Sequence, residues 1–163
     1  MQTSLHLGKR CRIWLLLFLA MMSLGAAAER SVYSQISNKE LKQRTLGLVK
    51  NIRDIVESYN QKDRELMTDY DKKDQPEYRS DERKNMRQQW IRQSDAVHDA
   101  TMRRYKENYW ADAILLLDEL YRRVPQRMRQ KGMLPIYQHP TNVLGMETIA
   151  NHLELLAKAL PDA

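Results

Sequence analysis

Residues 37–59 read "SNKELKQRTLGLVKNIRDIVESY" and carry the clearest helical pattern in the chain. Ser37 and Glu40 have the spacing of a capping box, in which Ser37 caps the amide of Glu40 and the Glu40 carboxylate reaches back. Apolar or compact residues then recur every three or four positions, at Leu41, Thr45, Leu48, Ile52, Ile55 and Tyr59. Such a stripe is typical of a helix with one buried face, so this segment needs a partner to pack against.

Helix is expected on both sides of this segment, because Gly47 and Pro76 are the only glycine and proline between residues 34 and 124. Proline disfavours helical geometry in the residue before it, which predicts one helix over 37–73 and a second over 77–124. The second helix has its own apolar stripe, at Ile91, Met102, Tyr105, Tyr109, Ala113, Leu116, Leu120 and Val124.

A third helix is predicted over 142–160, after a connector of residues 125–141 that contains three of the five prolines. Its stripe consists of Ile149, Leu153, Leu156 and Leu160. Chain reversal near residue 75 makes the first two helices antiparallel, with Tyr59 opposite about residue 92. The sequence thus predicts an all-α fold: a long antiparallel helical hairpin and a shorter C-terminal helix form a three-helix bundle, and a polar hairpin tip protrudes from it as the less stable part.

The N-terminus has the three parts of a secretory signal. Lys9, Arg10 and Arg12 precede an uncharged, mostly apolar run over residues 13–25, and Ala26 and Ala28 suit the −3 and −1 positions of a cleavage site. The run is shorter than the roughly 20 residues that span a bilayer. We therefore expect residues 1–28 to be a cleaved signal peptide, residues 29–163 to form a single helical domain, and no permanent membrane anchor to remain.

Charge and cysteine content restrict the class of protein. The chain has 27 basic and 21 acidic residues, a net charge of +6. Three of the basic residues and none of the acidic ones precede residue 29, so the segment that follows carries +3. This mixed surface argues against a nucleic-acid partner, since nucleic-acid-binding domains gather their bases on one face. Cys11 is the only cysteine. Export without a disulfide fits the periplasm of a Gram-negative bacterium, with secretion to the medium as the alternative.

Residues 105–125, "YKENYWADAILLLDELYRRVP", combine aromatic and acidic side chains in a way that suggests a site. On a helix, however, the aromatic residues join the inward stripe, while the acids point in different directions. Glu107 and Asp118 lie on the outer side, and Asp112 and Glu119 lie at the edge of the stripe. A glycosidase needs two carboxylates that face one cleft. We therefore interpret this segment as a packing surface with a solvated acidic back.

The remaining signals for chemistry are weak. Asp95 and His98 have a spacing that could supply two metal ligands from one helix, but no second copy of the motif follows. Phosphate-cradling glycine loops and nucleophile motifs do not occur. The prediction is a protein without enzymatic activity and without a cofactor.

The most promising residues stand singly among charged ones on the hairpin. They are large, apolar or aromatic side chains of the kinds favoured at protein interfaces, namely Met67, Tyr70, Tyr78, Met86 and Trp90. They could instead only hold the two helices of the hairpin together. The leading hypothesis is an exported interaction, scaffold or chaperone-like protein that holds a protein partner or a second copy of itself. A metal- or small-ligand-binding helical bundle is the alternative.

Overall fold

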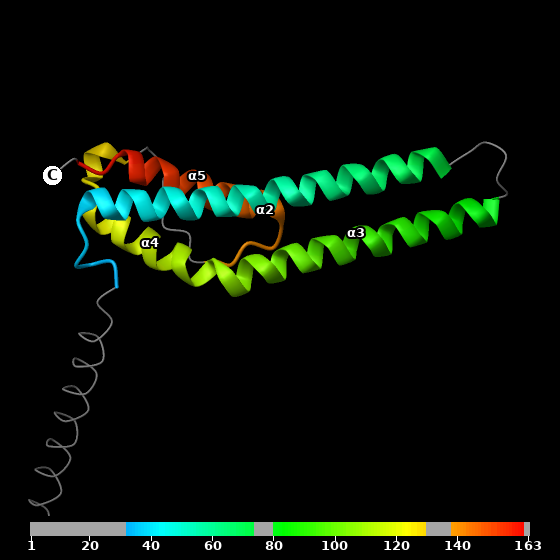
Figure 1. The fold of residues 1–163 in the computed structure, drawn as a ribbon, viewed down its shortest axis with the longest axis horizontal. Helices are drawn as coiled ribbons and strands as arrows, with labels where there is room; N and C mark the ends of the chain where they lie inside the picture. Colours follow the sequence, from blue (N-terminus) through cyan, green and yellow to red (C-terminus); the bar gives the residue numbers. More distant parts are fainter. Residues whose placement is uncertain (1–31, 74–79, 130–137, 162–163) are drawn as a thin grey trace, which may run out of the picture. The chain divides into compact units, whose positions relative to one another are not determined.

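A computed structural model describes residues 32–73, 80–129 and 138–161 of the chain. It divides into two units, Met1–Ser34 and Gln35–Ala163, and the helices of the described residues belong to the second (Figure 1). The predicted signal peptide and Tyr78 lie outside the described residues. Within the described residues the fold is all-α, as predicted, with the elements α2 (Asn38–Lys73), α3 (Ser80–Asn108), α4 (Trp110–Arg123), a 3-10 turn (Gln126–Met128) and α5 (Val143–Lys158).

The start of α2 follows half of the predicted capping box. Ser37 Oγ accepts a hydrogen bond from the Glu40 amide at 3.2 Å. The Glu40 carboxylate does not reach back, because it is bonded to Arg44 one turn later, at 2.8 Å from Nη2. The predicted stripe is buried from Leu41 through Ile55, and Tyr59, its last member, is half-buried. The apolar periodicity thus located both the helix and its inward face.

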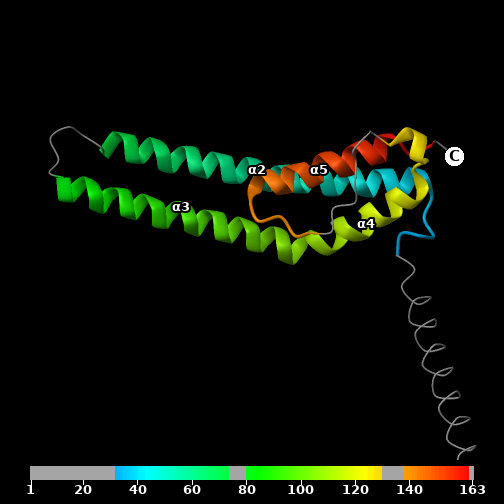
Figure 2. The same ribbon diagram turned by 180° about the vertical axis from the view of Figure 1, so that it is seen from behind.

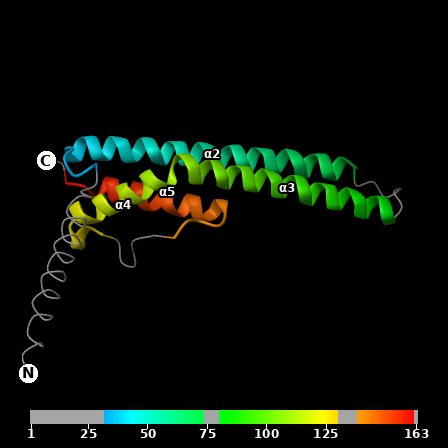
Figure 3. The same cartoon turned by 90° about the horizontal axis from the view of Figure 1, so that it is seen from below.

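α5 is the helix that closes the core. Its N-terminus is capped by Asn142, whose side-chain oxygen accepts from the Gly145 amide at 2.8 Å. All four residues of its predicted stripe are buried. α5 packs along the first half of α2 and also against α4 (Figure 3). We call α4, α5 and the part of α2 up to Tyr59 the bundle.

The prediction of one continuous helix over 77–124 is wrong, because the chain turns at Tyr109. This residue has φ −133° and ψ −22°, outside helical geometry, and it separates α3 from α4. Hydrogen bonds still run from the Tyr109 amide to Tyr105 and from the Ala113 amide to Tyr109, both at 2.9 Å. The turn is therefore a kink. Neither glycine nor proline marks it, and it places α4 against α5, so packing overrides the local helical preference.

The part of α2 from Asn60 to Lys73 and the part of α3 from Ser80 to Ser94 run alongside each other beyond the end of α5 (Figure 2). We call this two-helix segment the arm. Tyr105 is the only residue of α3 that is fully buried. Ile91, predicted to face the core, is 41 % exposed, because α5 does not extend over it. Among the described helices, none is both long and apolar enough to cross a bilayer.

α2 and α3 are paired in a different register from the predicted one. The ring of Tyr59 lies 6.3 Å from the ring of His98, centroid to centroid, and Ser94 Oγ donates to Asp63 at 3.4 Å. The prediction had placed residue 92 opposite Tyr59. The observed partner of Tyr59 lies about six residues later in the chain than predicted. The later start of α3, at Ser80 where the prediction began it at 77, accounts for about three of them.

Candidate functional site

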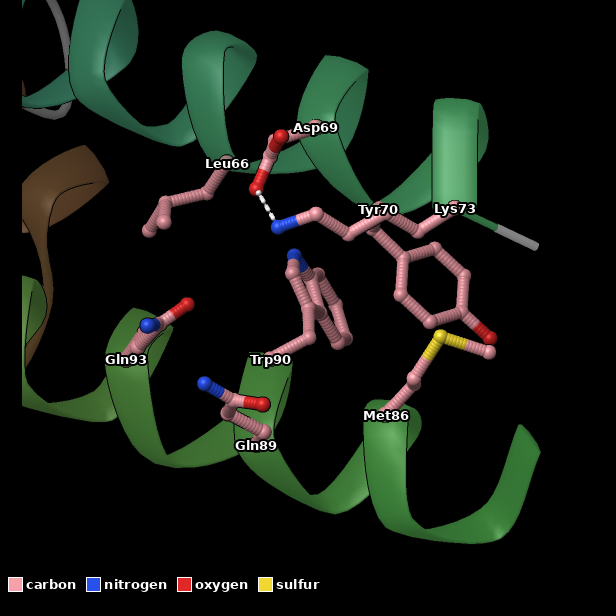
Figure 4. Close-up of a pocket in the computed structure, with 8 residues that line it drawn as sticks. All are labelled: Leu66, Asp69, Tyr70, Lys73, Met86, Gln89, Trp90 and Gln93. Carbon is pink, nitrogen blue, oxygen red and sulfur yellow. Dashed lines mark hydrogen bonds and ion pairs between the residues drawn. The ribbon is translucent and has the colours of Figure 1, made fainter. Parts of the chain in front are cut away.

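The arm contains a small hollow between its two helices, which we call the Trp90 notch (Figure 4). Each helix contributes two pairs of residues four positions apart, which places them on one side of that helix. From α2 come Leu66, Asp69, Tyr70 and Lys73, and from α3 come Met86, Gln89, Trp90 and Gln93. The notch is therefore a product of the register in which the helices pair.

Aromatic contact joins the two walls of the notch. The Tyr70 and Trp90 rings are 5.7 Å apart between centroids and tilted by 42°, within the range of favourable aromatic pairs. Both side chains are half-buried. Above them on α2, Lys73 Nζ and Asp69 Oδ2 form an ion pair at 2.6 Å. The notch thus has an aromatic floor beneath a charged rim.

The Trp90 indole lacks a hydrogen-bond partner. Its Nε1 is buried and has no acceptor among the described residues, and it points toward the side where Asp69 and Lys73 meet (Figure 4). A buried donor left unpaired costs roughly 1–3 kcal/mol, so an acceptor supplied from outside would recover that free energy. A partner protein would therefore bind here more tightly if it placed an oxygen where it can accept the hydrogen bond of the indole N–H.

The size of the notch restricts what it can take. Its volume is about 50 Å³, whereas pockets for small ligands measure roughly 300–1,000 Å³. One water molecule occupies roughly 30 Å³. The notch therefore suits the tip of one side chain, or a carbonyl group of an approaching chain, better than a metabolite.

Three of the five residues predicted for partner contact come together here. Tyr70, Met86 and Trp90 all line the notch. Met67 is 42 % exposed on α2 but does not line it, and Tyr78 is outside the described residues. The sequence analysis missed the polar members, Asp69, Lys73, Gln89 and Gln93. Their signal was spacing: Asp69 and Lys73 are four residues apart, as are Gln89 and Gln93, and each pair flanks an aromatic residue of the notch.

The proposed metal pair is not assembled as a ligand set. Asp95 is exposed, and His98 lies half-buried against Tyr59 with its Nδ1 3.5 Å from Asp99 Oδ1. Across the described residues, no group of three or more histidine, cysteine or acidic side chains gathers around a common point. No observation in the structure therefore favours the alternative of a metal-binding bundle.

Among the acids of residues 105–125, Glu107, Asp112 and Asp118 are exposed. Glu119, which the prediction placed at the edge of the apolar stripe, is buried instead. It is only 2 % exposed. Arg122 Nη2 donates to both of its oxygens, at 2.6 and 2.7 Å, and Arg123 Nε donates to Oε1 at 2.5 Å. Burial raises the pKa of Glu119, and the two arginines outweigh that effect, so its pKa is lowered. This is a structural ion cluster and not a catalytic pair of carboxylates.

A second aromatic group lies at the kink between α3 and α4. The ring of His139 is 5.2 Å from that of Trp110 and 5.8 Å from that of Tyr105, between centroids. The Tyr105 hydroxyl and His139 Nε2 are buried without a hydrogen-bond partner among the described residues, and burial raises the pKa of Tyr105. This group packs the kink, and no carboxylate or second histidine adjoins it in the contacts described.

Comparison with protein-family models, with curated proteins and with solved structures gives no match to this chain. Its function is therefore argued from its own residues.

Proposed function

We propose that this chain is an exported, non-enzymatic helical protein of the bacterial periplasm that holds another protein. The contact would be made through the arm, with a second copy of the chain as one form of partner. A scaffold or chaperone-like role fits this design, in which one half of the molecule is a packed bundle and the other half is a projecting pair of helices.

The observation that supports the proposal is the Trp90 notch. Tryptophan, tyrosine and methionine are enriched in protein interfaces, and tryptophan and tyrosine often supply most of the binding energy. Here Tyr70, Met86 and Trp90 lie together on a part of the molecule that is otherwise mostly charged or polar, and no described residue accepts a hydrogen bond from the indole N–H. A role limited to joining the two helices would leave that donor without a use.

Site-specific photo-crosslinking in the cells of origin tests the contact. A photoreactive amino acid is placed at Met67 or Gln89 on the arm, and, as matched controls, at the exposed Leu115 or Leu144 of the bundle. We expect a discrete crosslinked species from the arm positions only, and Trp90→Ala to weaken it while Leu115→Ala does not. A second copy is recognised by mass spectrometry of the product. Equal crosslinking from arm and bundle, or none from either, contradicts the proposal.

Export is tested separately, on the chain recovered from cell fractions. The proposal expects the protein in the periplasmic extract with Glu29 as its first residue, because cleavage would follow Ala28. Recovery in the membrane pellet with an intact N-terminus would show that residues 1–28 are not cleaved and remain as a membrane anchor.

A further inference from the structure

A second hollow lies between α2 and α3, next to the bundle, and we call it the junction groove. Its volume is about 280 Å³, several times that of the Trp90 notch. Most of its lining residues are apolar or small, and two are basic. They are Ile55, Ser58, Lys62, Ala96, Val97, Ala100, Thr101 and Arg104. Small side chains on both walls allow a third backbone to approach closely, at the 8–10 Å axis distance of packed helices.

The junction groove and the Trp90 notch form one strip along the same side of the two helices. On α2, Ser58, Lys62, Asp69 and Lys73 are separated by four, seven and four residues, which keeps them on one side. On α3 the corresponding row consists of Gln89, Gln93, Ala96, Ala100 and Arg104. From Ile55 to Lys73 the strip is about 27 Å long at 1.5 Å per residue, the length of a helix of about 18 residues.

The helix α5 leaves this strip uncovered, because it packs on the opposite side of α2. Arg53 marks that side, since its Nη2 donates to Asn151 of α5 at 2.9 Å and pairs with Glu154 of the same helix. Lys62 follows Arg53 by nine residues, and at 100° per residue that separation is half a turn. Along the first half of α2 this chain covers the side of Arg53 and leaves the side of Lys62 open, and along the arm no described helix covers either side.

The charged and hydrogen-bonding groups along the strip indicate which kind of partner surface would bind there. Lys62 and Arg104, one from each helix, are exposed at the groove and form no ion pair among the described residues. The third group in need of a partner is the buried Nε1 of Trp90. All three are donors, whereas the carboxylate of Asp69 is already paired with Lys73. A complementary surface must supply acceptors and negative charge.

We propose that the strip binds an acidic, amphipathic α-helix of a partner protein, with carboxylates of that helix paired to Lys62 and Arg104. The partner's apolar seam lies on Ala96, Val97 and Ala100, and one of its oxygens reaches Trp90 Nε1. This inference rests on the proposed function and adds to it the class of partner and the place where it sits. A second copy of the chain in a symmetric pair would present the same three donors, so it is the less suited occupant.

Peptide binding to the protein purified after expression of the full chain tests the inference. Two labelled amphipathic peptides of about 18 residues share one alanine and leucine seam and carry either glutamate or lysine on its flanks. Fluorescence anisotropy measures their affinities at about 0.05 M and about 0.3 M salt, because screening weakens exposed charge pairs. We expect the acidic peptide to bind at least about tenfold more tightly than the basic one at the lower salt.

Paired variants locate the binding. Lys62→Glu with Arg104→Glu should weaken the acidic peptide by at least about tenfold. The matched control, Lys84→Glu with Lys106→Glu, makes the same change in net charge at exposed positions of α3 that line neither hollow and should leave affinity within about twofold. Ala100→Trp fills the groove and should abolish binding, whereas Ala111→Trp on α4 should not. Circular dichroism confirms that each variant folds.

Several results would overturn the inference while leaving the proposed function in place. One is equal weakening by the two charge-reversal pairs, which indicates general attraction. Another is a preference for the basic peptide, or no binding of either, while crosslinks from Met67 and Gln89 persist in cells. A third is a dimer in sedimentation that Ala100→Trp dissociates and charge reversal does not, which would place a second copy in the strip. Loss of the crosslinks as well would remove both proposals together.

Discussion

Arg123 donates from Nε to Oε1 of Glu119 over 2.5 Å, and its Nη1 donates to the carbonyl oxygen of Ile36 at 2.7 Å. The same nitrogen lies 3.0 Å from Asn38 Oδ1, and Asn38 Nδ2 donates in turn to the carbonyl oxygen of Pro161. A carboxylate buried near the end of α4 thus connects the start of α2 and the end of α5. This network fixes the end of the bundle that lies away from the arm.

Glu119→Gln should destabilise the protein by about 1–3 kcal/mol, because it leaves the half-buried Arg123 without its charged acceptor. The size of the side chain is unchanged, so no cavity contributes. Urea unfolding followed by circular dichroism gives the free energy of unfolding. Glu107→Gln is the matched control, since Glu107 is exposed, and should change it by less than about 0.5 kcal/mol. Equal effects of the two substitutions would show that the Glu119 cluster does not hold the bundle together.

The same carboxylate should make stability fall in acid. Burial raises the pKa of Glu119, but hydrogen bonds and charges from Arg122 and Arg123 outweigh it, so the folded pKa lies below the ordinary 4.5. The unfolded chain then binds more protons in this window, and stability is complete above pH 4.5 and lost as the pH falls through the folded pKa. Glu119→Gln should make this decline shallower. The substitution should not abolish the loss of stability in acid, because Lys158 and Arg53 also lower the pKa of Glu154.

His152 should contribute at a higher pH. Burial lowers its pKa from the ordinary 6.5, because the charged imidazolium loses hydration. Protonation therefore favours the unfolded chain, and this part of the stability is present above pH 6.5 and lost as the pH falls through the folded pKa. NMR titration of the imidazole resonances measures that pKa directly. A value for His152 at or above 6.5 would contradict the burial seen in the structure.

Periodic patterns in the sequence were sufficient for the helices that bury one continuous stripe. Leu41 to Ile55 in α2 and Ile149 to Leu160 at α5 are buried as predicted, because apolar residues three or four positions apart line up on one side of any helix. Ser37 could also be identified as the residue before α2, since its hydroxyl satisfies an amide of the first turn. These inferences need only local geometry.

Features that depend on distant parts of the chain could not be found in this way. The kink at Tyr109 has no local signal, and it exists because α4 packs on α5. Glu119 was placed at the edge of a stripe, and its burial depends on Arg123 reaching a carbonyl more than eighty residues earlier. The Trp90 notch needs the register between α2 and α3, which the position of Pro76 did not determine. In each case the outcome depends on which residues from a distant part of the chain pack against the segment.

Replacing the two described glycines by alanine should change stability in opposite directions. Gly47 is exposed within α2, and an added Cβ there would meet nothing within 4 Å. Gly47→Ala should therefore stabilise by about 0.5–1 kcal/mol through helix propensity. At Gly145 the added Cβ would lie 2.8 Å from Pro140 Cβ, beside the cap made by Asn142. Gly145→Ala should destabilise by about 1 kcal/mol or more, since such overpacking costs about 1–3 kcal/mol. Thermal unfolding of both variants measures the signs, and stabilisation by Gly145→Ala would show that α5 can shift away from Pro140.

Local stability should differ sharply between the bundle and the arm. All buried side chains of α2 precede Tyr59, and no described helix covers Met67 and Ile91 of the arm, both about two-fifths exposed. Segments with few buried contacts open more easily than a core. In native-state hydrogen exchange, amides of residues 62–73 and 80–92 should therefore exchange faster than those of residues 45–56 and 146–157.

Two substitutions separate this local opening from global unfolding. Leu153→Ala removes a fully buried side chain of α5, and should lower the free energy of unfolding by about 2–5 kcal/mol, with faster exchange throughout the bundle. Met67→Ala should lower it by less than about 0.5 kcal/mol, because that side chain has little contact to lose. The acidic peptide proposed for the strip should slow exchange in residues 58–73 and 89–104 while leaving residues 146–157 unchanged. Arm amides as protected as those of α5 without any peptide would mean that the two helices are stable unaided, and the exposed residues of the arm would then need no partner.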